Sequence, residues 1–215
     1  ILNKSKKVSK IFCFPGNAGT SLIAKNISLD PNNFSELEKH CIENQIKLLV
    51  VGPEKPLVNG VVDFFKGKPI KVFGPDKISS KLEGSKIFTK EICQKNNIPT
   101  SKFKIFKNLN QTIDYLKNSH FPLVIKADGL AAGKGVYICK NFNDAKIASE
   151  EIFNGKFGDA DQILVEEFLE GEEMSYFIIT DGKNFKFFGS AQDHKRVGEG
   201  DTGKNTGGMG CYSPS

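Results

Sequence analysis

The sequence predicts an α/β fold in which an incomplete doubly wound parallel sheet is followed by a smaller α+β unit and the beginning of a further sheet. Three observations support this prediction. Short apolar runs alternate with amphipathic stretches, Ile46–Val51 is the nearly continuous apolar run typical of a buried parallel strand, and Gly-Pro turns follow two of the runs. The 215 residues are enough for one large domain or two small ones.

The amino-terminal part is expected to alternate strands and helices that are joined by short turns. Phe34–Asn44 carries apolar residues close to helical spacing after a Pro-Asn-Asn start, and Ile98-Pro99 closes the last helix because the residue before a proline disfavours helical backbone. The expected strands are Ile11–Phe14, Ile46–Val51 and Ile70–Phe73, and the expected helices are Phe34–Asn44, Val58–Phe65 and Ser85–Asn97.

The pattern then changes to a compact β-α-β–β-α-β unit, followed by a hairpin that turns through Asp181-Gly182-Lys183. We therefore expect a substrate-binding α/β domain over residues 1–101, a small subdomain over 102–170 and the beginning of a third domain over 171–215. The expected strands are Lys102–Phe106, Leu123–Lys126, Val136–Lys140, Gln162–Glu166, Met174–Thr180 and Phe185–Ala191, and the expected helices are Asn108–Asn118 and Asn143–Phe153.

Composition excludes several classes of protein. A hydrophobic content of 39% and a charged content of 26% are typical of soluble globular proteins. No apolar run approaches the ~20 residues that a membrane-spanning helix needs. The five cysteines are scattered and form no C-x-x-C pair, which favours reduced, mostly buried thiols in a cytoplasmic protein over a disulfide framework or a zinc site.

The net charge of +5 raises the hypothesis of a nucleic-acid-binding protein, but the details argue against it. The basic residues are spread along the chain and Arg196 is the only arginine, whereas proteins that bind a phosphate backbone usually rely on arginine. RNA recognition would need exposed aromatic residues, and the 18 phenylalanines fall mainly at positions expected in the core. We expect small-molecule substrates and no nucleic-acid or membrane partner, and the sequence leaves the oligomeric state open.

The segment Lys126–Val136 combines three glycines with two lysines, an arrangement that lets backbone N–H groups and ammonium groups converge on phosphate oxygens. It is not a P-loop, because only three residues separate Gly129 from Gly133, glycine follows Lys134, and a strand comes next. A strand–loop–strand flap over phosphates fits better. The alternative is a plain glycine-rich hairpin with solvated lysines.

A run of acidic residues, Glu166–Glu173, ends an apolar strand. A purine can form hydrogen bonds with backbone groups at a strand end, and a carboxylate can hold ribose hydroxyls. Glu166 is a candidate acceptor for the exocyclic amine, and Glu173 is a candidate ligand of the ribose. The alternative is a solvated acidic loop.

Acidic and basic side chains precede a glycine-rich segment near the end of the chain. Asp193, Lys195 and Arg196 come shortly before Thr206–Gly210, which suits a carboxylate or phosphate substrate. The alternative is a long polar surface loop, although structureless loops of this length are uncommon without a function.

Taken together, these segments resemble the ATP-grasp superfamily, and the chain is similar to the phosphoribosylamine–glycine ligase (glycinamide ribonucleotide synthetase) family over essentially its whole length. The resemblance implies a cytoplasmic ligase of de novo purine biosynthesis that uses ATP and Mg²⁺ or Mn²⁺ to join glycine to 5-phosphoribosylamine through a glycyl phosphate. The motifs that carry it are Pro15–Thr20, Gly52–Val58, Leu82–Lys90, Lys126–Val136, Glu166–Glu173 and Asp193–Pro214.

The resemblance also implies roles for single residues. Lys86 and Lys126 resemble the two lysines that reach the ATP phosphates, and Lys195 resembles the lysine near the transferred phosphoryl group. Glu167 and Leu169 would contact adenine through backbone groups. The residues expected to bind ATP are Lys86, Lys126, Asp128, Gly129, Gly133, Lys134, Gly135, Glu166, Glu167, Leu169 and Glu173. The residues expected to bind substrate are Gly16, Asn17, Gly52, Pro53, Glu54, Asn205, Gly207 and Gly208, and those expected near the reacting centre are Asp193, Lys195 and Arg196.

The sequence departs from the family pattern at both ends. The first strand and Gly-Gly-Arg-Glu turn of the family should precede Ile1, and its Glu and Asn metal ligands should follow Ser215. We therefore expect no metal ligand in this chain, and expect the chain to be an inactive fragment of a longer enzyme. The alternatives are another ATP-grasp carboxylate–amine ligase and a non-catalytic nucleotide-binding module.

Overall fold

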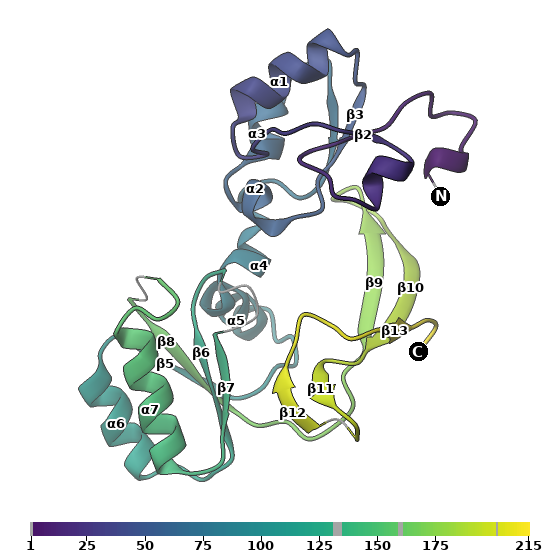
Figure 1. The fold of residues 1–215 in the computed structure, drawn as a ribbon. Coiled ribbons are helices and arrows are strands. Elements are labelled where there is room, and N and C mark those ends of the chain that lie inside the picture. Colours follow the sequence, from purple (N-terminus) through teal and green to yellow (C-terminus); the bar gives the residue numbers. More distant parts are fainter. Residues whose placement is uncertain (1, 131–134, 159–160, 201) are drawn as a thin grey trace. The chain divides into compact units, whose positions relative to one another are not determined.

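A computed structural model describes residues 2–130, 135–158, 161–200 and 202–215 (Figure 1). The chain divides into two compact units, Ile1–Thr89 and Lys90–Ser215, which we call the amino-terminal and carboxy-terminal units. The division falls within one helix, α5 (Lys86–Lys95). In the described residues, no helix combines the length and the apolar composition required to cross a membrane.

The amino-terminal unit contains two pairs of parallel strands. The strand β1 (Phe12–Cys13) pairs with β2 (Lys25–Asn26), and β3 (Leu48–Val50) pairs with β4 (Lys71–Phe73). Both pairs are parallel, as the alternation of strands and helices predicts. The helices of this unit are η1 (Leu2–Lys4), η2 (Thr20–Leu22), α1 (Phe34–Glu43), α2 (Glu54–Val58), α3 (Val61–Phe65) and α4 (Lys81–Gly84).

The single helix expected over Val58–Phe65 is wrong, because the structure has two short helices there. Gly60 separates them with a left-handed backbone, φ +94°, which only glycine adopts at little cost. The turn lets Val61 and Phe65 enter a core that also contains Leu37 and Cys41 from α1. The break in the helix therefore serves the packing of this unit.

The carboxy-terminal unit begins with a four-stranded antiparallel sheet in the order β5-β8-β6-β7. The helices α6 and α7 contact each other and cover one face of this sheet (Figure 1). This arrangement confirms the predicted β-α-β–β-α-β unit. The bounds are β5 (Phe103–Phe106), α6 (Leu109–Lys117), β6 (Leu123–Ala127), β7 (Val136–Cys139), α7 (Phe142–Phe153) and β8 (Ile163–Glu167).

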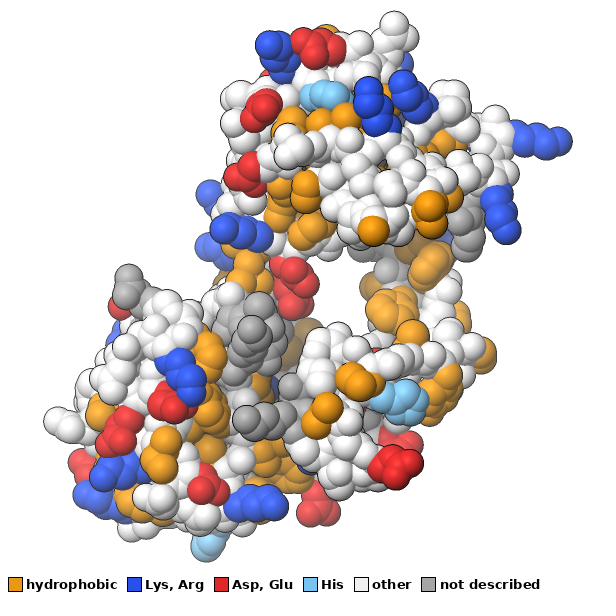
Figure 2. Space-filling view, in the orientation of Figure 1, with side chains coloured by type: hydrophobic (Ala, Val, Ile, Leu, Met, Phe, Trp, Pro, Cys, Tyr) orange, Lys and Arg blue, Asp and Glu red, His pale blue; other side chains and the backbone are white. Residues whose placement is uncertain are grey.

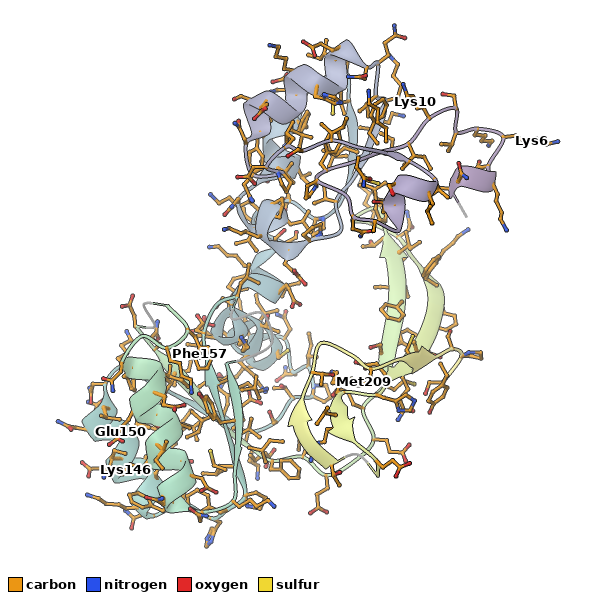
Figure 3. All side chains as sticks on the ribbon, viewed as in Figure 1. Lys6, Lys10, Lys146, Glu150, Phe157 and Met209 are labelled. Carbon is orange, nitrogen blue, oxygen red and sulfur yellow. The ribbon has the colours of Figure 1, made fainter. Side chains whose placement is uncertain are left out.

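Capping side chains and an apolar core explain why these elements form here. Asn108 and Asn141 accept hydrogen bonds from backbone N–H groups in the first turns of α6 and α7. Ile125, Ile152 and Ile163 meet in a core that water does not reach. Figure 3 shows the opposite, polar side of α7, which carries Lys146 and Glu150 one turn apart.

The strands β9 (Ser175–Thr180) and β10 (Phe185–Asp193) form the predicted hairpin, with a bulge between Phe187 and Gly189. Its apolar side chains are exposed, and Figure 2 shows them as a group over the hairpin. The phenylalanines of this hairpin depart from the expected core positions, since Phe185, Phe187 and Phe188 are more than half exposed. Elsewhere the expectation holds for half of the 18, because Phe65 is buried and eight others pack against the cores of the two units.

The last residues are not a structureless loop. The strand β11 (Arg196–Gly198) pairs with β12 (Thr202–Asn205), and β13 (Cys211–Tyr212) pairs with β10. Gly203, at φ +86°, provides the left-handed residue of the β12 strand. The charged residues at the end of β10 thus lie in a paired, ordered segment.

Candidate functional site

Glu166, near the end of β8, is a buried carboxylate with three polar neighbours. It is 4% exposed. The hydroxyl of Ser101 donates to Oε2 at 2.6 Å, and Nζ of Lys90 lies 3.1 Å from the same oxygen. Nζ of Lys126 lies 3.0 Å from the other oxygen, Oε1. We call Lys90, Ser101, Lys126 and Glu166 the Glu166 cluster.

Strand pairing brings this cluster together. In the central strand β8, Glu166 lies opposite Val124 of β6 and Phe103 of β5. Lys126 is two residues further along β6, so its side chain is on the same face of the sheet as that of Val124. Residues of three segments distant in sequence therefore reach one carboxylate.

The environment keeps Glu166 ionised. Burial raises the pKa of Glu166. The hydroxyl of Ser101 and the ammonium groups of Lys126 and Lys90 lower this pKa, and because their combined effect is larger, the pKa lies below its ordinary value. Although Lys126 is close to Oε1, no hydrogen bond of acceptable geometry reaches that oxygen. In the part of the chain that the structure describes, Oε1 is the buried side-chain oxygen that lacks such a bond. It can accept one from a ligand.

The glycine-rich segment between β6 and β7 begins next to this cluster. The two strands pair in antiparallel fashion up to Lys126 and Val136, and the N–H of Ala127 donates to the carbonyl of Gly135 at 2.8 Å. This is the strand–loop–strand arrangement expected for the segment. Asp128 and Gly129 are half-buried, with Gly129 at φ +91°, whereas Gly133 and Lys134 lie outside the described residues.

The end of β8 presents backbone and apolar groups. The N–H of Glu167 donates to the carbonyl of Lys102, and Oε1 of Glu167 accepts from the N–H of Lys102 at 2.8 Å. Both groups of Glu167 are thus used within the fold. Leu169, two residues later, is 64% exposed and offers an apolar surface beside the strand end.

A second group of predicted residues meets around the end of β10. Lys195 forms an ion pair with Glu173, and its carbonyl accepts hydrogen bonds from both the N–H and the hydroxyl of Thr206. Arg196 is half-buried and lies opposite Asn205 in the pairing of β11 with β12. The side chain of Asn205 is outside the described part of the structure.

Further backbone hydrogen bonds hold this segment together. Asp193 pairs with Cys211, and His194 exchanges hydrogen bonds with Met209 and Gly210. The exposed residues Gly207 and Gly208 lie in the turn that these contacts close. The predicted residues of this segment therefore lie on or next to two short strand pairs, β10–β13 and β11–β12.

In the amino-terminal unit, Gly16 and Asn17 form a turn after β1. Gly16 is at φ +81°, and a Cβ there would lie 2.2 Å from Oδ1 of Asn26, so only glycine fits. Oδ1 of Asn17 accepts from the N–H of Thr20 at 3.0 Å, which assigns this side chain a role in the turn itself.

The other predicted residues of this unit lie at the ends of its elements. Gly52 and Pro53 follow β3, and Glu54 is the first residue of α2; all three are exposed. The expected position after the carboxyl end of a parallel strand is confirmed. Lys86, half-buried, begins α5.

Sequence reasoning missed two members of the Glu166 cluster, Lys90 and Ser101. Lys90 stands in the quoted motif Leu82–Lys90, yet it received no role. Its burial at 9% exposure was not visible in the sequence. Ser101 follows Pro99 and Thr100, and nothing in that pattern indicates that its hydroxyl meets a carboxylate 65 residues later.

Metal ligands are not gathered in the described ranges. Within residues 2–130, 135–158, 161–200 and 202–215, no group of three or more His, Cys, Asp or Glu side chains is placed to hold a metal ion. Two carboxylates of the candidate site, Glu166 and Glu173, are engaged with lysines. These residues do not fit a divalent cation.

Two family models match the chain end to end. One, described as the N domain of phosphoribosylglycinamide synthetase, matches residues 1–83, and the other, its ATP-grasp (A) domain, matches residues 84–215. The boundary between them lies six residues from the division of the chain into units after Thr89.

Relatives with known names agree with this match. The phosphoribosylamine–glycine ligase of Pasteurella multocida is 46% identical over 216 residues, which cover 99% of this chain and 50% of that protein. The ligase of the same name from Mesorhizobium japonicum is 47% identical over 212 residues, 98% of this chain and 50% of that protein. The crystal structure of the Thermotoga maritima ligase covers 100% of this chain and 52% of its own, with a TM-score of 0.81 and 30% identity. The chain spans about half the length of the curated relatives it matches.

Proposed function

The chain belongs to the phosphoribosylglycinamide synthetase family, and on this premise we propose that it forms part of an ATP-dependent ligase that joins glycine to 5-phosphoribosylamine. The products are glycinamide ribonucleotide, ADP and phosphate, and the reaction is a step of de novo purine biosynthesis in the cytoplasm. The three domains over residues 1–101, 102–170 and 171–215 are part of the same proposal.

The observation that carries the proposal is the pairing of Lys126 with Glu166 beside the glycine-rich segment. Oε1 of Glu166 is buried, ionised and without a well-aligned donor, which suits the exocyclic amine of adenine. Lys126 stands at the start of the loop and extends a cation toward a triphosphate. Leu169 offers an apolar contact for the base beyond the strand end.

The chemistry consists of two balanced steps. An oxygen of the glycine carboxylate attacks the γ-phosphorus, the new O–P bond forms, and the bond from phosphorus to the leaving oxygen of ADP breaks. The amine of phosphoribosylamine then attacks the carbonyl carbon of glycyl phosphate. The C–N bond forms, phosphate leaves with the former carboxylate oxygen, and the amine loses a proton.

For these steps the chain supplies positively charged side chains and residues that keep water away from the reacting groups. Arg196, in the β11–β12 ladder, and Lys195, whose carbonyl accepts from Thr206, offset the negative charge that two anionic reactants bring together. Asp193 lies next to them and is proposed to orient the incoming amine. Asp128, Gly129 and Gly135, at the ends of β6 and β7, are proposed to lie beside the triphosphate, where keeping water out protects the labile acyl phosphate.

A divalent cation, Mg²⁺ or Mn²⁺, supplies charge neutralisation on the transferred phosphoryl group when it is bound. The described residues hold no fitting group of ligands, so no step is assigned to the cation through them. Glu173 is proposed as the ribose ligand, which is consistent with its position at the end of the segment after β8.

The amino-terminal unit is proposed to bind phosphoribosylamine. Gly16, Asn17, Gly52, Pro53 and Glu54 lie at carboxyl ends of strands, where α/β folds commonly bind their ligands. The anionic phosphate of this substrate matches a chain with a net charge of +5. Asn205, Gly207 and Gly208 are proposed as further substrate contacts.

The test is a reaction with the full-length protein that carries this sequence. With ATP, glycine and freshly generated phosphoribosylamine, we expect equal amounts of ADP and glycinamide ribonucleotide, and no product when any one reactant is omitted. ATP turnover with another amino acid or amine, but not with this pair, would establish a different carboxylate–amine ligase. Nucleotide binding without turnover on any pair would establish a non-catalytic module.

A further inference from the structure

Lys90 is a buried lysine to which the proposed chemistry gives no role. Its ammonium group lies 2.7 Å from the hydroxyl of Thr100, 2.5 Å from that of Ser101 and 3.1 Å from Oε2 of Glu166. An ammonium group has three N–H donors, and all three have an acceptor within reach here. Burying a lysine costs free energy unless the charge is paired in this way.

The two oxygens of Glu166 have different surroundings. Oε2 receives the hydroxyl of Ser101 at 2.6 Å and faces Lys90, so three side chains form a closed triangle of contacts. Oε1 lies 3.0 Å from Nζ of Lys126 and accepts no well-aligned hydrogen bond from the described residues. One oxygen is therefore fixed by the fold, and the other is left to a ligand.

We propose that Lys90 is a positioning residue, which acts with Ser101 to anchor Oε2 of Glu166 so that Oε1 selects a nucleotide whose base carries an exocyclic amine. This inference rests on the proposed function, since it assigns a base specificity to the same nucleotide site. Lys90 itself touches no ligand. Its effect passes through the orientation of the carboxylate, which Lys90 and Ser101 no longer hold once their contacts with Oε2 are removed.

The chemistry of the base provides the selectivity. An ionised carboxylate only accepts hydrogen bonds, so it binds the amine of adenine and repels the carbonyl oxygen that hypoxanthine carries at the same position. A buried acceptor left facing another acceptor loses its hydrogen bond and gains no water in return. ATP and inosine triphosphate thus differ at the atom that Oε1 faces, while their phosphates and ribose are the same.

The experiment measures dissociation constants of ATP, 2′-deoxy-ATP and inosine triphosphate by calorimetry with the full-length protein. We expect Lys90→Met to weaken the binding of ATP and of 2′-deoxy-ATP by the same factor, about 10-fold, which corresponds to the loss of one charge-assisted hydrogen bond. Inosine triphosphate should bind as it does to the wild type, so the preference for ATP falls about 10-fold. The KM for ATP should rise while kcat changes little.

Lys117→Met is the matched control, because Lys117 lies on α6 in the same unit and forms an ion pair with the exposed Asp114. It should leave both affinities and the preference unchanged. If Lys90→Met does not fold, Ser101→Ala decides, since it removes the donor at 2.6 Å from Oε2 and keeps the lysine. A reduced preference for ATP in Ser101→Ala supports the proposal, and an unchanged preference overturns it.

Three further outcomes are distinguishable. Equal weakening of ATP and inosine triphosphate in Lys90→Met, or wild-type binding of both, overturns the positioning role. A wild-type protein that makes product but does not discriminate between the two nucleotides overturns this inference and leaves the proposed ligase intact. A wild-type protein that neither binds ATP nor makes product overturns the proposed function, and the inference with it.

Discussion

The ammonium group of Lys195 pairs with the carboxylate of Glu173, 22 residues earlier in the chain. Their side chains are 40% and 70% exposed, and pairs this open to water contribute only about 0–1 kcal/mol to stability. The pair joins the proposed ribose ligand to the lysine proposed to lie near the transferred phosphoryl group. We therefore expect this ion pair to contribute to substrate binding rather than to the stability of the fold.

Glu173→Gln tests this expectation. It removes the charge that accepts ribose hydroxyls and orients Lys195, so we expect the KM for ATP to rise by about 10-fold, the cost of one charge-assisted hydrogen bond. The urea midpoint of unfolding should stay near that of the wild type. Glu170→Gln, an exposed carboxylate of the same segment, is the control and should have wild-type kinetics. Equal effects of the two substitutions, or a large loss of stability in Glu173→Gln, would contradict the assignment.

Lys126→Met tests the other proposed nucleotide contact. Lys126 faces Glu166 and is proposed to reach the triphosphate, so the loss of its charge should weaken ATP binding by ~1.5–3 kcal/mol in calorimetry. Lys117→Met again serves as control. Wild-type ATP affinity in Lys126→Met would show that the lysine only balances Glu166.

The same substitution has a consequence for stability at acid pH. Because the pKa of Glu166 is lower in the folded protein than its ordinary value, the ionised carboxylate contributes stability above the ordinary pKa. This stability is lost as pH falls through the folded pKa. Removing Lys126 raises that pKa toward its ordinary value, so the fall of the urea midpoint between pH 7 and strongly acid pH should be smaller in Lys126→Met than in the wild type. Superimposable profiles would exclude the coupling.

The sequence predicted the local elements well because their patterns are local. The bounds of α6, α7 and β5–β8 agree with expectation within a few residues, and asparagine caps mark both helices. The prediction of one helix over Val58–Phe65 was wrong at Gly60. The prediction relied on the spacing of apolar residues and gave too little weight to this glycine, which adopts a left-handed backbone in the fold. The exposed phenylalanines of β9 and β10 were misplaced because alternation predicts a strand but not what covers its faces.

The candidate site was predicted in its parts but not in its connections. Glu166 and Lys126 were both singled out, yet their ion pair depends on the register of β6 against β8, which no local pattern specifies. The pair between Lys195 and Glu173 was invisible for the same reason. Lys90 was overlooked because a lysine on a helix is usually solvated, and only the fold shows that this one is buried.

The cysteines should differ widely in reactivity, although the sequence suggested mostly buried thiols. Burial raises the pKa of the Cys139 thiol to about 11 and, with Glu38 nearby, also raises the pKa of Cys41. Cys211 is exposed on β13. In a native titration with a disulfide reagent at pH 8, Cys211 should react first, and Cys211→Ser should remove that fast phase. Cys139 and Cys41 should react only when the protein unfolds. Rapid labelling of either one in the native protein would contradict the packing of its unit.

Arg196 provides the last test, since it is the only arginine in a chain that otherwise uses lysine. It begins β11, where pairing with Asn205 fixes its backbone, and it is half-buried rather than free on the surface. A planar guanidinium can grip a carboxylate or phosphate with two parallel hydrogen bonds, which the point charge of lysine cannot reproduce.

Arg196→Lys keeps the positive charge and removes the planar guanidinium that can donate two parallel hydrogen bonds. We expect kcat/KM for glycine and phosphoribosylamine to fall by about 10-fold or more, equivalent to ~1.4 kcal/mol of transition-state stabilisation. The affinity for ATP should barely change, because Arg196 is assigned to the substrate side. Arg196→Met should lose more activity than Arg196→Lys, since it removes the charge as well. If Arg196→Lys retains wild-type kinetics while Arg196→Met does not, a point charge is sufficient and the two-bond grip is wrong. If both retain them, Arg196 has no part in the reaction.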